Sequence, residues 1–198
     1  MGAERPVPFG RRVAVYGPAG SGKSTLARAL GERLGLPVVE LDAVYHARPN
    51  WQDLSREEFR AAVTRILAEH PDGWVIEGNY AVVRDLVLPL AEAVVWLDLP
   101  FGVVYQRLAM RTIGRALAAA ELWNGNRETL RQTFFSRNSM LLWGLTAFRR
   151  TGRSVEESLR TLRRPGVPVY RLRTPGQAAY LLRNARPAGG AHGPAPTG

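Results

Sequence analysis

Eight consecutive residues near the start of the chain have the types and spacing that a polyphosphate site requires. Residues 17–24 read GPAGSGKS, which fits the pattern GxxxxGK[ST] in full. Lys23 would reach the β- and γ-phosphates, and the Ser24 hydroxyl would be a ligand of Mg²⁺. The pattern therefore predicts ATP and Mg²⁺ as cofactors. The predicted nucleotide-binding residues here are Gly17, Pro18, Ala19, Gly20, Ser21, Gly22, Lys23, Ser24 and Thr25.

A magnesium ion in such a site needs a second protein anchor, usually an acidic residue at the end of a strand. Glu77 follows the apolar run 74–76, and Asp98 follows the run 93–97. Either carboxylate could hold a water of the Mg²⁺ shell. Alternatively, each carboxylate only caps the turn that follows its strand.

Three arginines are spaced four residues apart, at Arg107, Arg111 and Arg115, which places them on one face of a predicted helix. Stacked like charges cost about 0.2–0.5 kcal/mol per pair unless an anion lies among them. A triphosphate is such an anion, and phosphoryl transfer needs positive charge around the transferring group. We therefore predict catalytic roles for Arg107 and Arg111 first and Arg115 second. The alternative is a solvated basic face in an arginine-rich protein.

The composition narrows the chemistry and the partners. The absence of cysteine excludes disulfides, thiolate metal sites and cysteine nucleophiles, and the three histidines lack metal-binding spacing. A formal net charge of +10 favours anionic partners, namely nucleotides, phosphorylated metabolites or nucleic acid. Lys23 is the only lysine, so the positive net charge partly reflects an arginine-rich composition rather than a specific binding surface. Nucleic acid is therefore the less favoured partner.

Alternating strand and helix patterns must position these residues. Continuous apolar runs predict five buried strands, at residues 12–16, 37–41, 74–76, 93–97 and 167–172. Helical patterns lie at 23–34, 55–69, 81–90, 101–120, 127–150, 154–164 and 175–184, and 42–54 is predicted to be irregular. This order predicts a three-layer α/β P-loop fold, with a five-stranded parallel sheet flanked by helices and a helical lid.

The length of 198 residues predicts one domain, over 1–186. The arginine-bearing region, at about 107–135, is predicted to be a lid that closes over the phosphates and excludes water. Residues 1–10 are predicted to be a loose lead-in. Residues 187–198, rich in Gly, Pro and Ala, are predicted to be a disordered tail. No apolar run is long enough for a membrane span, and no signal peptide is evident. We expect a cytoplasmic monomer or homodimer.

Several short motifs follow one another along the chain: GPAGSGKST at 17–25, LD at 41–42, PNW at 49–51, IEGNY at 76–80, WLDLP at 96–100 and RLRTP at 171–175. In these motifs the stretch 12–182 resembles the adenylate-kinase-like P-loop kinases, most closely the group of DNA topology modulation proteins. The phosphate loop is shared by all P-loop proteins, whereas the GNY and LDLP elements together are more diagnostic.

The resemblance implies roles for individual residues. Glu77 takes the place of the acid that acts near Mg²⁺, with a reach one methylene longer than the Asp of the family. Arg173, in the RLRTP segment, would lie close to the adenine base. Contacts with the acceptor are implied for Asn79, Tyr80 and Arg84.

The acceptor site is predicted at the end of the second strand. Asp42 lies there, at the carboxyl edge of the sheet where ligands bind. Shikimate and gluconate kinases carry an acid at a comparable place, so similarity makes Asp42 a candidate general base or hydroxyl anchor; the alternative is a turn aspartate. Tyr45, His46, Trp51 and Tyr80 form an aromatic set that could stack on a base or sugar. The alternative for this set is local packing.

These observations predict an ATP-dependent kinase that transfers the γ-phosphoryl group to a nucleoside, nucleotide or hydroxylated metabolite. The predicted catalytic residues are Lys23, Asp42, Arg107 and Arg111. Two other functions stay open: a nucleic-acid-associated ATP-binding protein that modulates DNA topology, supported by the charge and the family resemblance, and an antibiotic phosphotransferase.

Overall fold

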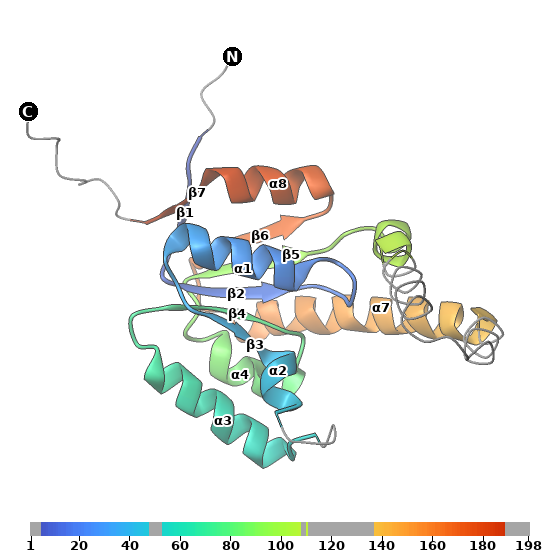
Figure 1. Ribbon diagram of the computed structural model, residues 1–198, viewed down its shortest axis with the longest axis horizontal. Helices are drawn as coiled ribbons and strands as arrows, with labels where there is room; N and C mark the ends of the chain where they lie inside the picture. The colour runs from blue at the N-terminus through green and yellow to red at the C-terminus, as the bar shows by residue number, and fades with distance from the viewer. Residues whose placement is uncertain (1–4, 48–52, 108–109, 111–136, 189–198) are drawn as a thin grey trace, which may run out of the picture.

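The structure is a computed structural model that describes residues 5–47, 53–107, 110 and 137–188 (Figure 1). Its centre is a five-stranded sheet in the order β3-β4-β2-β5-β6, and every pair of neighbouring strands is parallel. The strands are β2 (Arg12–Tyr16), β3 (Val38–Glu40), β4 (Trp74–Glu77), β5 (Ala93–Leu97) and β6 (Val169–Leu172). The five predicted strands and the predicted fold class are confirmed.

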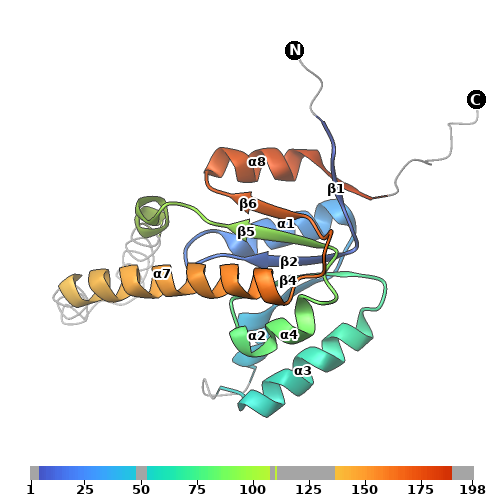
Figure 2. The same ribbon diagram turned by 180° about the vertical axis from the view of Figure 1, so that it is seen from behind.

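Helices cover both faces of this sheet, as Figures 1 and 2 show. One face carries α1 (Lys23–Leu34) and α8 (Pro175–Asn184). The other carries α3 (Arg56–Glu69), the 3₁₀ turn η2 (Ala81–Val83), α4 (Arg84–Val87) and α7 (Arg137–Thr161). Side chains alternate along β2, so that Val13 and Val15 pack toward α1 while Ala14 and Tyr16 pack toward α3 and α7.

The helix boundaries follow local signals in the sequence. The Ser55 side chain accepts a hydrogen bond from the Glu58 backbone, and the Glu58 side chain accepts one from the Ser55 backbone. This reciprocal pair satisfies amide groups that the first turn of α3 leaves without helical partners. Helix α8 begins with the same arrangement between Thr174 and Gln177.

Three local predictions are wrong. Residues Val7–Phe9 of the expected lead-in form β1, which pairs in parallel with β7 (Ala185–Pro187), where the tail was expected to begin. Helix α2 (Leu41–Tyr45) lies inside the segment predicted to be irregular. Helix α7 continues through the expected break at residues 151–153, because Val155 and Leu159 are buried and this packing outweighs the low helix propensity of Gly152.

Of the predicted lid, the described residues include only Arg107 and Met110, and both are helical. The predicted tail lies outside them from residue 189 onward. Among the helices that the structure describes, none has the length and apolar character needed to cross a bilayer.

Candidate functional site

The phosphate loop connects the end of β2 to the start of α1, as the sequence predicts. Gly22 is the N-cap of α1 and has a φ of 91°, a backbone conformation that favours glycine. Gly17 allows a close approach, since a Cβ there would lie 2.7 Å from Ser21 Oγ and 2.8 Å from Leu97 Cβ. Helix α1 begins at Lys23, so its positive dipole end is directed at the loop. The backbone is therefore shaped for an anion.

The side chains of Lys23 and Ser24, at the start of α1, contact the side chain of Glu77, at the end of β4. Glu77 is the last residue of β4 and only 1% exposed. Its Oε1 accepts a hydrogen bond of 2.9 Å from Ser24 Oγ, and its Oε2 lies 3.6 Å from Lys23 Nζ. The ammonium, hydroxyl and carboxylate that nucleotide and Mg²⁺ binding require thus lie together at the carboxyl ends of β2 and β4.

The buried carboxylate fits a magnesium site. Burial raises the pKa of Glu77, and the Lys23 ammonium and Ser24 hydroxyl partly offset that rise. The buried Glu77 Oε2 and Ser21 Oγ have no hydrogen-bond partner among the described residues. Since Mg²⁺ commonly takes one or two protein ligands together with substrate phosphates, Ser24 and Glu77 suffice as its protein anchors. A nucleotide with its metal would give these orphaned oxygens partners.

Asp98, the other predicted magnesium anchor, is engaged elsewhere. Its Oδ2 lies 2.8 Å from Arg171 Nη2 and 3.9 Å from Arg173 Nε. The Arg171 guanidinium also lies 4.1 Å from the centroid of the Trp96 ring. The geometry therefore favours Glu77 over Asp98. Arg173 directly follows β6 and is exposed. Its contact with the adenine base, which the family resemblance implies, stays a prediction.

Arg107 reaches the phosphate loop from the helical stretch 101–107. Its Nη1 donates a hydrogen bond of 2.9 Å to the Ser21 carbonyl. The exposed guanidinium therefore lies beside the phosphate loop, and its catalytic role stays a prediction. Arg111 and Arg115 lie outside the described residues.

Asp42 lies in the first turn of α2 and is exposed. Burial raises the pKa of the Tyr80 phenol, and a hydrogen bond to Asp42 adds to this effect. Glu40 lies opposite Glu77 in the parallel register of β3 and β4, and Asp42 follows two residues later at the same edge of the sheet. The carboxylate predicted to contact the acceptor thus lies at the same sheet edge as the phosphate loop.

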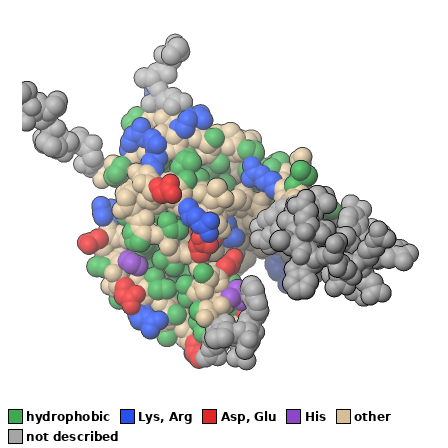
Figure 3. Space-filling view, in the orientation of Figure 1, with side chains coloured by type: hydrophobic (Ala, Val, Ile, Leu, Met, Phe, Trp, Pro, Cys, Tyr) green, Lys and Arg blue, Asp and Glu red, His purple; other side chains and the backbone are tan. Residues whose placement is uncertain are grey.

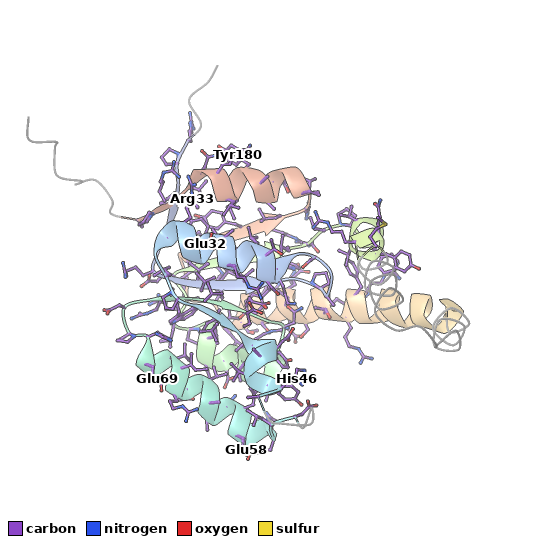
Figure 4. All side chains as sticks on the ribbon, in the orientation of Figure 1. Glu32, Arg33, His46, Glu58, Glu69 and Tyr180 are labelled. Carbon is purple, nitrogen blue, oxygen red and sulfur yellow. The ribbon has the colours of Figure 1, made fainter. Side chains whose placement is uncertain are left out.

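The aromatic set is packed on itself. The ring centroids of Tyr45, Phe59 and Tyr80 lie 4.9–5.2 Å apart, and Phe59 is fully buried. This favours the packing alternative for Tyr45 and Tyr80, although both rings stay partly exposed. His46 lies at the end of α2, near the start of α3, and its Nδ1 is 2.7 Å from Asp53 Oδ1 (Figure 4). Trp51 lies outside the described residues.

Two predicted acceptor contacts have other partners. The side-chain amide of Asn79 donates to the Gly17 carbonyl, and its Oδ1 accepts from the Gly17 amide at 3.2 Å. Arg84 is 2% exposed, and its described hydrogen bonds all go to protein atoms. The structure therefore gives no support to the predicted acceptor contact of Arg84, which stays a prediction. Sequence reasoning missed the two hydrogen bonds between the Asn79 side chain and the Gly17 backbone, because no local pattern predicts that residues 79 and 17 lie together.

Comparison with known families gives an independent classification. The model of a family described as "AAA domain" matches residues 13–132, which is more than half of the chain. The chain belongs to this AAA domain family. Membership in the family and the complete phosphate loop together imply nucleotide binding. No curated protein matches the sequence.

Solved structures match the fold of this AAA domain protein. Shikimate kinase from Acinetobacter baumannii, in complex with shikimate, is 19% identical, with a TM-score of 0.50 over 88% of this chain and 89% of that one. Shikimate kinase from Bacteroides thetaiotaomicron is 16% identical, with a TM-score of 0.50 over 87% and 94%. A gluconokinase from Sinorhizobium meliloti 1021 is 20% identical, with a TM-score of 0.47 over 90% of each chain. At such identities the similarity to the two shikimate kinases shows the fold alone, an α/β fold with a five-stranded parallel sheet like that of small P-loop kinases.

Proposed function

We propose that this protein is an ATP-dependent kinase that transfers the γ-phosphoryl group to a hydroxyl of a small acceptor. The observation that carries the proposal is that Lys23, Ser24 and Glu77 contact one another at the sheet edge where Asp42 also lies, two residues after the register partner of Glu77. The exposed carboxylate of Asp42 at this edge favours transfer over nucleotide binding alone. The motif resemblance to adenylate-kinase-like proteins supports the same proposal.

The groups present can serve an in-line transfer. The acceptor oxygen would form a bond to the γ-phosphorus while the bond from that phosphorus to the bridging oxygen of ADP breaks, and Asp42 would take the hydroxyl proton. The Lys23 ammonium and Arg107 would lie around the transferring group and stabilise its charge. Magnesium, when held by Ser24 and Glu77, supplies further neutralisation of the phosphates.

The acceptor is proposed to be a hydroxyl compound such as a nucleoside or a hydroxylated metabolite. Asp42 is negatively charged, and a carboxylate receives a hydroxyl proton but repels a phosphate. Nucleotides remain acceptors only through a sugar hydroxyl in this proposal.

The nucleic-acid alternative gains no support from the face of the molecule that Figure 3 shows. On the face that Figure 3 shows, Lys and Arg side chains are interspersed with Asp and Glu. Nucleic-acid sites typically gather basic residues into one patch or stripe. Measuring DNA affinity against salt concentration would test this alternative, since binding that survives about 150 mM salt and weakens steeply with added salt would revive it.

The test of the proposal is a transfer assay. The purified protein is incubated with ATP, Mg²⁺ and a panel of nucleosides, nucleotides, aminoglycoside-type antibiotics and hydroxylated metabolites, and products are followed by mass spectrometry. We expect one acceptor class to gain a phosphoryl group and to stimulate ADP release. ATP binding with no product and no acceptor-stimulated turnover would contradict the proposal.

A further inference from the structure

Arg84 connects two parts of the molecule from a buried position. Its Nη1 donates to the Ser154 carbonyl at 2.8 Å, to Ser154 Oγ at 2.7 Å and to Ser158 Oγ at 3.1 Å. Ser154 and Ser158 lie one turn apart on α7, which Figure 2 shows crossing the sheet beside α4. Burying a guanidinium is costly unless hydrogen bonds replace its water. The partners of Nη1 therefore fix Arg84 firmly to α7.

The other nitrogen of the same guanidinium connects to the phosphate loop. Arg84 Nη2 donates to the Asn79 carbonyl at 2.9 Å, and the Asn79 side chain pairs with both the amide and the carbonyl of Gly17. Gly17 is the first residue of the loop, directly after β2. A continuous path of hydrogen bonds thus runs from α7 through Arg84 and Asn79 to the loop.

We propose that Arg84 and Asn79 form a relay that holds the phosphate loop in its binding geometry relative to α7, so that both are positioning residues for nucleotide binding. The inference rests on the proposed function only in naming the nucleotide as the ligand. Positioning matters here because the value of preorganised amide donors depends on displacements well below 1 Å.

Two other roles for Arg84 give different outcomes. A residue that only stabilises the fold would change the melting temperature but leave the nucleotide affinity of the folded protein unchanged. A residue that acts only through its charge would be replaced by lysine without loss. A relay requires the planar fork, because a lysine ammonium cannot span Ser154, Ser158 and the Asn79 carbonyl with the same geometry.

The experiment measures the Kd for ATP with Mg²⁺ by calorimetry on the full chain, for Arg84→Met, Arg84→Lys, Asn79→Ala and the double variant Arg84→Met/Asn79→Ala. We expect each single variant to raise Kd about 10-fold, as loss of a charge-assisted or buried hydrogen bond does. The Kd of the double variant should not exceed the higher of the two single-variant Kd values, because both residues act on one path. Wild-type Kd in folded Arg84→Met or Arg84→Lys, or additive effects in the double variant, would overturn the relay.

The matched control is Arg60→Met. Arg60, on α3, donates to the Val82 carbonyl and to Asp85 at 2.7 Å, so it holds the same segment from its solvent side without a bond to Asn79. We expect Arg60→Met to keep Kd within about twofold of wild type. A Kd raised as much as in Arg84→Met would contradict a specific path.

Two further measurements keep the inference testable. If Arg84→Met does not fold, Ser154→Ala/Ser158→Ala removes the hydroxyl partners and should raise Kd about threefold, while an unchanged Kd would count against the relay. Hydrogen exchange of residues 17–22 in nucleotide-free protein separates the relay from the proposed function. We expect exchange about 10-fold faster in Asn79→Ala than in wild type or Arg60→Met, even if no nucleotide binds; equal exchange would overturn the relay.

Discussion

The phosphate end and the proposed acceptor end of the site lie at the same edge of the sheet but are held by different means. At the phosphate end, Lys23 and Ser24 come from the first turn of α1, and the buried Glu77 ends β4. At the acceptor end, the exposed Asp42 comes from the five-residue helix α2 and is hydrogen-bonded to Tyr80. Tyr80 is itself placed by ring packing against Phe59.

This difference separates nucleotide binding, which the fold provides, from acceptor choice, which depends on particular side chains. Backbone geometry and a strand register position the phosphate end, so its chemistry follows from the fold. Side-chain packing on α2 and α3 positions the acceptor end, so changes there can alter the acceptor without disturbing the nucleotide. Variants at the two ends should therefore separate nucleotide binding from transfer.

The largest expected effect is that of Lys23→Ala at the phosphate end. Loss of the ammonium should lower turnover roughly 1000-fold and abolish measurable ATP binding, with an unchanged circular dichroism spectrum. Lys23→Arg keeps the charge but replaces a compact ammonium with a planar fork, so it should also be strongly impaired. Retained ATP-dependent turnover in Lys23→Ala would remove the site assignment.

At the acceptor end, Asp42→Asn should lower transfer roughly 100-fold or more, since a general base is lost. Its Kd for ATP should stay within about twofold of wild type, because Asp42 lies outside the phosphate loop. Steady-state kinetics and calorimetry on the same preparation check both numbers. Equal transfer by Asp42→Asn and wild type would rule out the proposed base.

Glu77→Gln tests the magnesium anchor and has a pH signature. Burial raises the pKa of Glu77, so its contribution to stability is present at low pH and is lost as pH rises from 4.5, its ordinary pKa, through the raised value. Glu77→Gln should therefore raise the melting temperature of the nucleotide-free protein at neutral pH relative to wild type. It should also weaken Mg²⁺-dependent ATP binding roughly 10-fold. A lower melting temperature at pH 7 together with unchanged Mg²⁺ dependence would contradict both assignments.

The smallest expected effect is that of Tyr80→Phe. It removes the hydroxyl that donates to Asp42 but keeps the ring in the cluster with Tyr45 and Phe59. Transfer should fall roughly fivefold with no change in ATP affinity, as loss of one hydrogen bond predicts. Tyr45→Phe is the matched control and should leave transfer unchanged; a drop equal to that of Tyr80→Phe would show that the hydroxyl of Tyr80 has no special part.

The sequence predicts the phosphate end well because its signals are local. The loop pattern, the five apolar runs and the capping box at Ser55 depend on neighbours within a few residues. The sequence also identifies Glu77 as a candidate magnesium anchor at the end of a strand. Preferring it over Asp98 required the structure, which shows Asp98 paired with Arg171 and Arg173.

The remaining features depend on contacts between distant parts of the chain. The pairing of β1 with β7 joins the two ends of the described chain, and each of these three-residue strands contains a proline, a residue that is depleted in strands. Arg84 resembles a surface ligand contact in the sequence, but its burial depends on Ser154 and Ser158, which lie 70 and 74 residues further along. Periodicity and motif spacing carry no information about such partners.

The most direct measurement is a calorimetric titration of the wild-type chain and Lys23→Ala with ATP in the presence of Mg²⁺. The account expects saturable binding of one nucleotide per wild-type chain, and no measurable heat of binding for the variant. If the wild-type chain bound no ATP at millimolar concentration, or if the variant bound it equally well, residues 17–24 would not be a nucleotide site.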